Sequence, residues 1–206
     1  MTWTVLDKSA LATFLEAIKT SAEAPLFSPL TCEARRMSLP FYEGVQLYRL
    51  TSYAAMPSFS LYYLCDGPRF FYLDGTVEPL LTVARSGALR LTEANIIAYL
   101  NFYFTFVTPS EGEIFLVHDP EAYPYQDEAR FDSPPSLSFG GTAPVYDVHT
   151  GADGALRVDT PLFSDGTLVR SLIEVDSLGR VEILRQQIQI RTSASDELSR
   201  SFSDHV

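Results

Sequence analysis

The chain has few of the residues on which common enzyme sites depend. Its 206 residues include three histidines, two cysteines and only two lysines, Lys8 and Lys19. It contains no G-x-G-x-x-G, G-x-x-x-x-G-K-[ST], H-E-x-x-H or G-x-S-x-G sequence. The usual signals of phosphate cradles, zinc peptidases and serine hydrolases are therefore missing. We expect no cofactor, and whether the protein is an enzyme is left open.

Long apolar runs and cysteine patterns are missing as well. No apolar run approaches the 18 residues of a membrane-spanning helix, and the N-terminal residues do not follow the pattern of a signal peptide. Cys32 and Cys65 form no C-x-x-C pair, so two reduced thiols are expected, although a disulfide would be possible if their Cα atoms lay within about 7 Å. The expectation is a cytoplasmic protein that binds no membrane.

Positive charge is scarce between residues 109 and 165. The net charge is −11; residues 1–108 hold nine acids and eight bases, whereas residues 109–165 hold eleven acids and two bases. An acidic surface repels phosphate backbones, so nucleic-acid binding is disfavoured. The acidic block suits a basic protein partner, but such blocks are more often solvated loops that keep a protein soluble.

One segment stands out by being apolar on nearly all sides. Residues 92–107 read TEANIIAYLNFYFTFV, with apolar residues at helical spacing from Ile96 to Val107 and further aromatic residues between them. Such a helix has to be covered on more than one side, so it is predicted as the central core helix, with Thr92 as its N-cap. An earlier segment, capped by Asp7, has a narrower apolar stripe and is predicted as an outer N-terminal helix.

The remaining pattern is mostly that of strands. Segments 45–53, 59–65, 69–73, 113–118, 145–149, 156–158, 160–163, 167–175 and 180–191 alternate or are bounded by turn residues, whereas 25–40 reads as irregular. The prediction is α+β: one bent antiparallel sheet of about seven to nine strands on the central helix, with a cystatin-like or NTF2-like cone as the alternative. Residues 1–191 are expected to form a single domain and 192–206 a frayed tail.

Residues FFYLDGTVEPLL (70–81) and LRLTEANIIAYLNFYFTFV (89–107) resemble a segment of uncharacterised bacterial proteins. The resemblance covers about residues 70–107. It implies a bacterial cytoplasmic domain, and it brings no activity and no site residues with it.

Two groups of side chains are candidates for a site. The tyrosines fall in elements that are expected to meet, so they either fill the core or line a small-ligand pocket with an arginine at its base; these candidates are Tyr62, Tyr72, Tyr99, Tyr103 and Arg49. His118, Asp119 and His149 lie near strand ends, where they would form a metal or acid–base site if the strands were adjacent. The alternative is that both histidines simply face water.

Three functions remain open. The first and preferred one is a non-enzymatic interaction module that binds through the acidic loop at 109–135. The second is a small-ligand-binding or enzymatic pocket lined by the tyrosines. The third is a subunit of a homo-oligomer that self-associates through a sheet face carrying Arg185 and Gln187, which alternation places on the same side as Val181 and Ile183.

Overall fold

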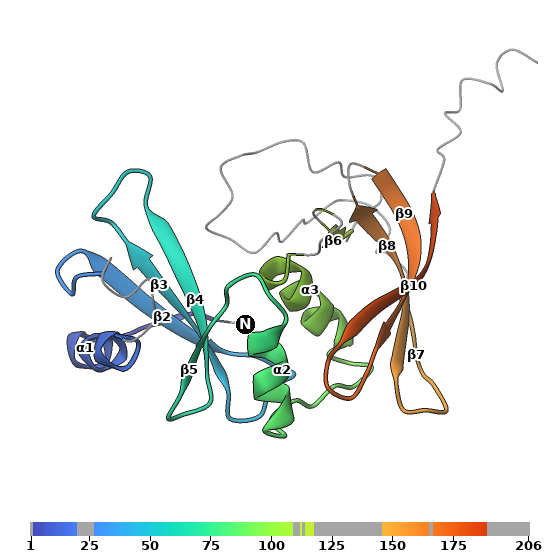
Figure 1. The fold of residues 1–206 in the computed structure, drawn as a ribbon, viewed down its shortest axis with the longest axis horizontal. Coiled ribbons are helices and arrows are strands. Elements are labelled where there is room, and N and C mark those ends of the chain that lie inside the picture. Colours follow the sequence, from blue (N-terminus) through green and yellow to red (C-terminus); the bar gives the residue numbers. More distant parts are fainter. Residues whose placement is uncertain are drawn as a thin grey trace, which may run out of the picture.

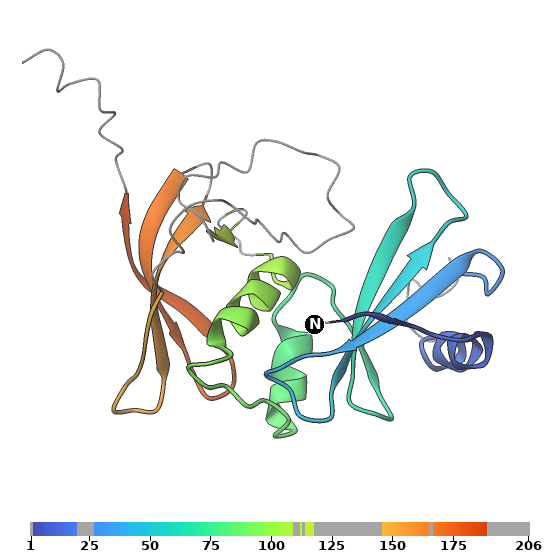
Figure 2. The ribbon, with the colours of Figure 1, turned by 180° about the vertical axis from the view of Figure 1, so that it is seen from behind.

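The protein is built in four layers, helix, sheet, helices and sheet (Figures 1 and 2). The structure is a computed structural model that describes residues 2–19, 27–108, 112, 114–117, 146–164 and 167–188. The α+β class predicted from the sequence is confirmed. No helix in these residues is long and apolar enough to cross a membrane.

The first sheet is antiparallel, with the strands in chain order from β1 to β5. Its strands are β1 (Thr4–Val5), β2 (Cys32–Ser38), β3 (Gln46–Ser52), β4 (Phe59–Cys65) and β5 (Phe70–Tyr72). The long strands β2, β3 and β4 pair along their whole lengths. Cys32 at the start of β2 is opposite Ser52 at the end of β3, and Gln46 at the start of β3 is opposite Cys65 at the end of β4. One face of the sheet packs on α1 and the other on the central helices.

Helix α1 (Lys8–Ala17) covers the outer face of the first sheet. Its N-cap is Asp7, whose carboxylate accepts a hydrogen bond from the Ala10 amide at 2.9 Å, as predicted. Only Leu11 and Phe14 of the helix are buried, and they pack with Ile18 against sheet residues such as Leu50 and Tyr63. The narrow apolar stripe therefore makes α1 the outer helix.

The central layer holds α2 (Glu78–Arg85) and α3 (Ile96–Phe106). Helix α3 is the predicted central helix, and it lies between the two sheets (Figure 1). It begins three residues later than expected, because residues 93–95 form a turn and the N-cap is Asn95 in place of the predicted Thr92. The Asn95 side-chain amide ties this turn down: it accepts from the Thr92 amide and donates to the Arg90 and Pro40 carbonyls.

The second sheet is antiparallel and lies on the far side of α3. It consists of β6 (Ile114–Leu116), β7 (Asp147–Thr150), β8 (Leu156–Ser164), β9 (Thr167–Val175) and β10 (Val181–Ile188). Strands β10, β9 and β8 are adjacent, and β6 and β7 pair with different halves of β8. Its inner-face residues, among them Val158 and Ile173, share one core with α3 and the first sheet.

Three details of the predicted fold are corrected. The strands form two separate sheets on opposite sides of α3, in place of one bent sheet or a cone around one helix. Residues 32–38, expected to be irregular, form β2. In β10, the register shifts between Ile183 and Arg185, so Ile183 pairs with buried Ile173 while Arg185 pairs with Leu172 on the other face. This bulge separates Arg185 and Gln187 from the face of Val181 and Ile183.

Candidate functional site

The predicted pocket residues Arg49 and Tyr62 are neighbours on the inner face of the first sheet. They are directly opposite each other on β3 and β4. The Arg49 guanidinium lies 5.3 Å from the centre of the Trp3 ring, and the Tyr62 ring lies 4.9 Å from that of Phe106 on α3. Both side chains are half-buried. The Tyr62 side chain therefore fills the space between the first sheet and α3.

Tyr99 and Tyr103 lie on α3, with ring centres 6.2 Å apart. Tyr99 is almost completely buried, and its hydroxyl donates a hydrogen bond of 2.5 Å to the Gly179 carbonyl in the β9–β10 turn. Burial raises the pKa of Tyr99 far above its ordinary value, so the hydroxyl stays protonated. Tyr99 therefore joins the central helix to the second sheet.

Tyr72 does not face the other predicted pocket residues. It lies on the α1 side of the first sheet, where its ring contacts that of Tyr63 at 5.4 Å. The five residues thus occupy three places: the inner face of the first sheet, its outer face and the central helix. Their geometry is that of aromatic packing, and a ligand role for them stays a prediction.

The histidine hypothesis is only partly within the described residues. His118 and Asp119 lie outside them. His149 is exposed on β7, opposite Arg157. Among the residues that the structure describes, no cluster of three His, Cys, Asp or Glu side chains is arranged to hold a metal. The acid–base or metal role of the set stays a prediction.

The two thiols are unsuited to act as nucleophiles. Both cysteines are free, with Cys65 buried and Cys32 half-buried. Burial raises the pKa of each thiol above its ordinary value. Because the thiolate is the reactive form, these thiols are weak nucleophiles near neutral pH.

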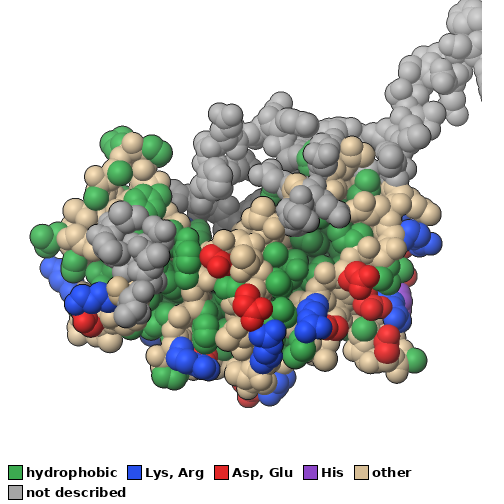
Figure 3. Space-filling model, in the orientation of Figure 1, with side chains coloured by type: hydrophobic (Ala, Val, Ile, Leu, Met, Phe, Trp, Pro, Cys, Tyr) green, Lys and Arg blue, Asp and Glu red, His purple; other side chains and the backbone are tan. Residues whose placement is uncertain are grey.

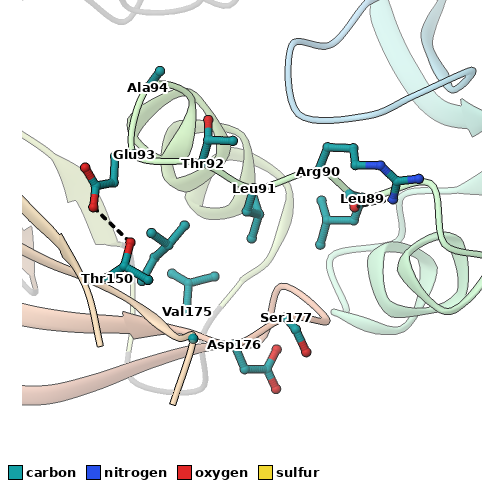
Figure 4. A pocket seen from close by; sticks show the side chains of 12 residues that line it. Leu89, Arg90, Leu91, Thr92, Glu93, Ala94, Thr150, Val175, Asp176 and Ser177 are labelled. Atoms are coloured by element: carbon teal, nitrogen blue, oxygen red, sulfur yellow. Dashed lines mark hydrogen bonds between the residues drawn. The ribbon is translucent and has the colours of Figure 1, made fainter. Parts of the chain in front are cut away.

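A hollow of about 670 Å³ lies where the loop before α3 meets two turns of the second sheet (Figure 4). Its apolar floor includes Leu89, Leu156 and Val175, and polar side chains stand at its rim. None of the predicted site residues lines it. This hollow could not easily be predicted from the sequence, because its lining comes from three segments that are far apart in the chain.

The rim groups of this hollow are already bound within the protein. Glu93 accepts a hydrogen bond of 2.8 Å from the Thr150 hydroxyl, and Asp176 accepts from two amides of its own turn. The Arg90 guanidinium binds two carbonyls of its own loop and lies 3.1 Å from Glu43. Of these interactions, Glu93 with Thr150 joins the loop before α3 to the second sheet, and Arg90 with Glu43 joins it to the β2–β3 loop. The hollow therefore lies at a contact between layers.

A second candidate surface lies at the end of the first sheet where β2 begins and β3 ends. Residues 28–31, just before β2, and residues 53–58, between β3 and β4, form two adjacent exposed loops. We call these ten residues the uncharged tip. Its large apolar side chains are strongly exposed: Met56 by 97%, Leu30 by 94% and Tyr53 by 58%. Single exposed apolar residues are ordinary, but three on adjoining loops suggest a contact surface.

The two loops of the uncharged tip are joined at their base. The Tyr53 amide donates to the Thr31 carbonyl at 2.8 Å, which joins the two loops, and the Thr31 amide donates to the Ser28 carbonyl at 3.0 Å. Beneath the loops, the rings of Phe27 and Phe59 lie 5.4 Å apart. The exposed side chains therefore stand on a preformed base, which lowers the entropy cost of binding.

Charge is absent from the tip and from the chain around it. No Asp, Glu, Lys or Arg occurs in residues 24–32 or 50–65. In Figure 3 the projecting upper left end, where the β3–β4 loop lies, shows hydrophobic and uncharged polar atoms without blue or red. This surface was not predicted from the sequence, although two charge-free stretches in a chain of net charge −11 are a signal of it.

Comparison with known proteins finds no relative of this chain. The chain matches no protein-family model, no curated protein and no solved structure.

Proposed function

We propose that the protein is a non-enzymatic interaction module that binds another protein surface through the uncharged tip. The observation that carries the proposal is the exposure of Leu30, Tyr53 and Met56 together on a charge-free projection whose two loops are joined by a backbone hydrogen bond. Interface centres are depleted in charge and enriched in aromatic residues and methionine. We retain a cytoplasmic location as part of the proposal.

This proposal moves the contact surface away from the acidic loop. Of residues 109–135, only 112 and 114–117 are described, so a basic partner for that loop stays a separate prediction. The tip offers no charge to a basic partner, and its contacts depend on burial of apolar area. Binding at the tip should therefore persist in high salt, whereas binding to the acidic loop should weaken as salt screens it.

The test is a pair of substitutions in the tip. Leu30→Asp combined with Met56→Asp should remove partner binding, because burying each side chain is worth about 1.5–3 kcal/mol and an unpaired carboxylate adds a desolvation cost. A loss of at least about a hundredfold in affinity is expected. The measurement is quantitative capture of binding proteins from extracts of the source organism, at low and high salt.

Leu184→Asp is the matched control. Leu184 is 45% exposed on β10, at the opposite end of the molecule. Proteins retained by the wild type and by this control, but lost with the double variant, support the proposal. If every captured protein is retained equally by all three forms, the tip is not the binding surface.

A further inference from the structure

We propose that the partner of the uncharged tip is a second copy of this chain, bound tip to tip about a twofold axis. This inference rests on the proposed function and names the occupant. A twofold contact uses the same patch on both subunits. A surface can therefore form such a contact only if its residues do not repel the same residues of the second copy. The tip meets that condition because it carries apolar side chains and no charges that would repel their own copies.

The charge distribution favours this arrangement over others. Residues 1–108, which contain the first sheet and the central helices, hold nine acids and eight bases, so this half is nearly neutral. Residues 109–206 hold seventeen acids and seven bases. Two copies that met through their second halves would repel each other. A tip-to-tip contact keeps the described second sheets far apart, since tip and second sheet lie at opposite ends of the long axis (Figure 1).

The same charges argue against the other occupants. An anionic membrane surface would repel a chain of net charge −11. A strongly basic protein would be drawn to the acidic half in preference to the tip. An uncharged apolar surface on the same near-neutral half avoids both problems, and a second copy supplies that surface.

The size of the tip sets the strength of the association. It has ten residues, whereas each side of a standard interface has about 20–30. The loops are joined at their base, which lowers the ordering needed on contact, but the buried area is small. A reversible dimer with a dissociation constant between about 1 μM and 1 mM is therefore expected.

Sedimentation equilibrium across this concentration range tests the inference. The wild-type chain should form a dimer that tightens as salt screens the net repulsion between copies. Met56→Asp and Leu30→Asp, tested separately, should each raise the dissociation constant at least tenfold, and Leu184→Asp should leave it unchanged. Both tip positions are almost fully exposed, so the variants should fold, which circular dichroism verifies.

Other results would overturn the inference. A wild-type chain that is monomeric at the highest concentration excludes the dimer, and so does a dimer that both tip variants leave intact. Co-sedimentation of the wild type, but not of Met56→Asp, with phosphatidylglycerol vesicles would assign the tip to lipid. If the chain is monomeric while the capture experiment still shows tip-dependent partners, the proposed function stands and only the second copy is wrong.

Discussion

Gly179→Ala should destabilise the protein by about 3–5 kcal/mol, although it adds a single methyl group. Gly179 lies in the β9–β10 turn at φ +78°, which costs a residue with a side chain about 1–2 kcal/mol. The new Cβ would also overlap the Tyr99 hydroxyl and lie 2.9 Å from Leu89 Cδ2. Overpacking of this kind costs about 1–3 kcal/mol, and a displaced Tyr99 loses its buried hydrogen bond. Urea unfolding measures the sum.

Gly154→Ala provides the matched control. Gly154 lies in the β7–β8 turn of the same sheet at φ +81°, and a Cβ there would have no atom within 4 Å. It should cost only the conformational strain of about 1–2 kcal/mol. The difference between the two variants therefore isolates the contact between the turn and α3. Equal losses of stability would show that this contact does not hold the second sheet in place.

Tyr99→Phe extends the same test. Alone it should cost about 1–3 kcal/mol, because the Gly179 carbonyl loses its partner. Combined with Gly179→Ala it removes the atom that the new methyl group would overlap. The two losses should then fall short of additivity by at least about 1 kcal/mol, as expected for residues in direct contact. Additive losses would contradict the contact.

Leu100→Ala should destabilise both sheets together, by about 2–5 kcal/mol. Leu100 is completely buried on α3, within the core that contains the inner faces of both sheets. Truncation removes apolar contacts and leaves a cavity between the layers. Because the layers share this core, hydrogen exchange should accelerate to the same extent in β3 of the first sheet and in β9 of the second.

Leu184→Ala makes the same chemical change at a half-exposed position on β10, and it should alter stability by less than about 0.5 kcal/mol. The shared core would be contradicted if Leu100→Ala accelerated exchange in one sheet and left the other unchanged. In that case the two sheets would unfold as separate units.

The elements with strong local signals were predicted from the sequence, and their assembly was not. The cap of α1 at Asp7 and the strands at 46–52 and 59–65 follow from capping chemistry and alternation. Strand β2 escaped because its sequence, CEARRMS, is polar and half-exposed; its pairing with β1 and β3 makes it a strand. Local pattern does not reveal which strands pair, so the division into two sheets was also missed.

The sequence pattern of the central helix predicted that the helix is enclosed, but it did not predict the contacts of its side chains. Its apolar residues on all sides required cover on more than one side, and α3 is indeed enclosed between two sheets. The same pattern could not distinguish aromatic packing from a ligand pocket. Tyr62 contacts Phe106, and Tyr99 bonds to Gly179, a residue 80 positions away in the chain. Such partners are set by the tertiary fold alone.

The most direct measurement for the proposed function is crosslinking from the tip itself. A photoreactive benzoylphenylalanine at position 56, introduced into the full chain in its native cell, should form covalent adducts with a protein partner on irradiation. The same residue at position 184 should not form them. An adduct of twice the chain mass would identify the second copy, and a different mass would identify another partner. If position 56 forms no adduct, or forms only those seen at position 184, the tip does not bind a protein.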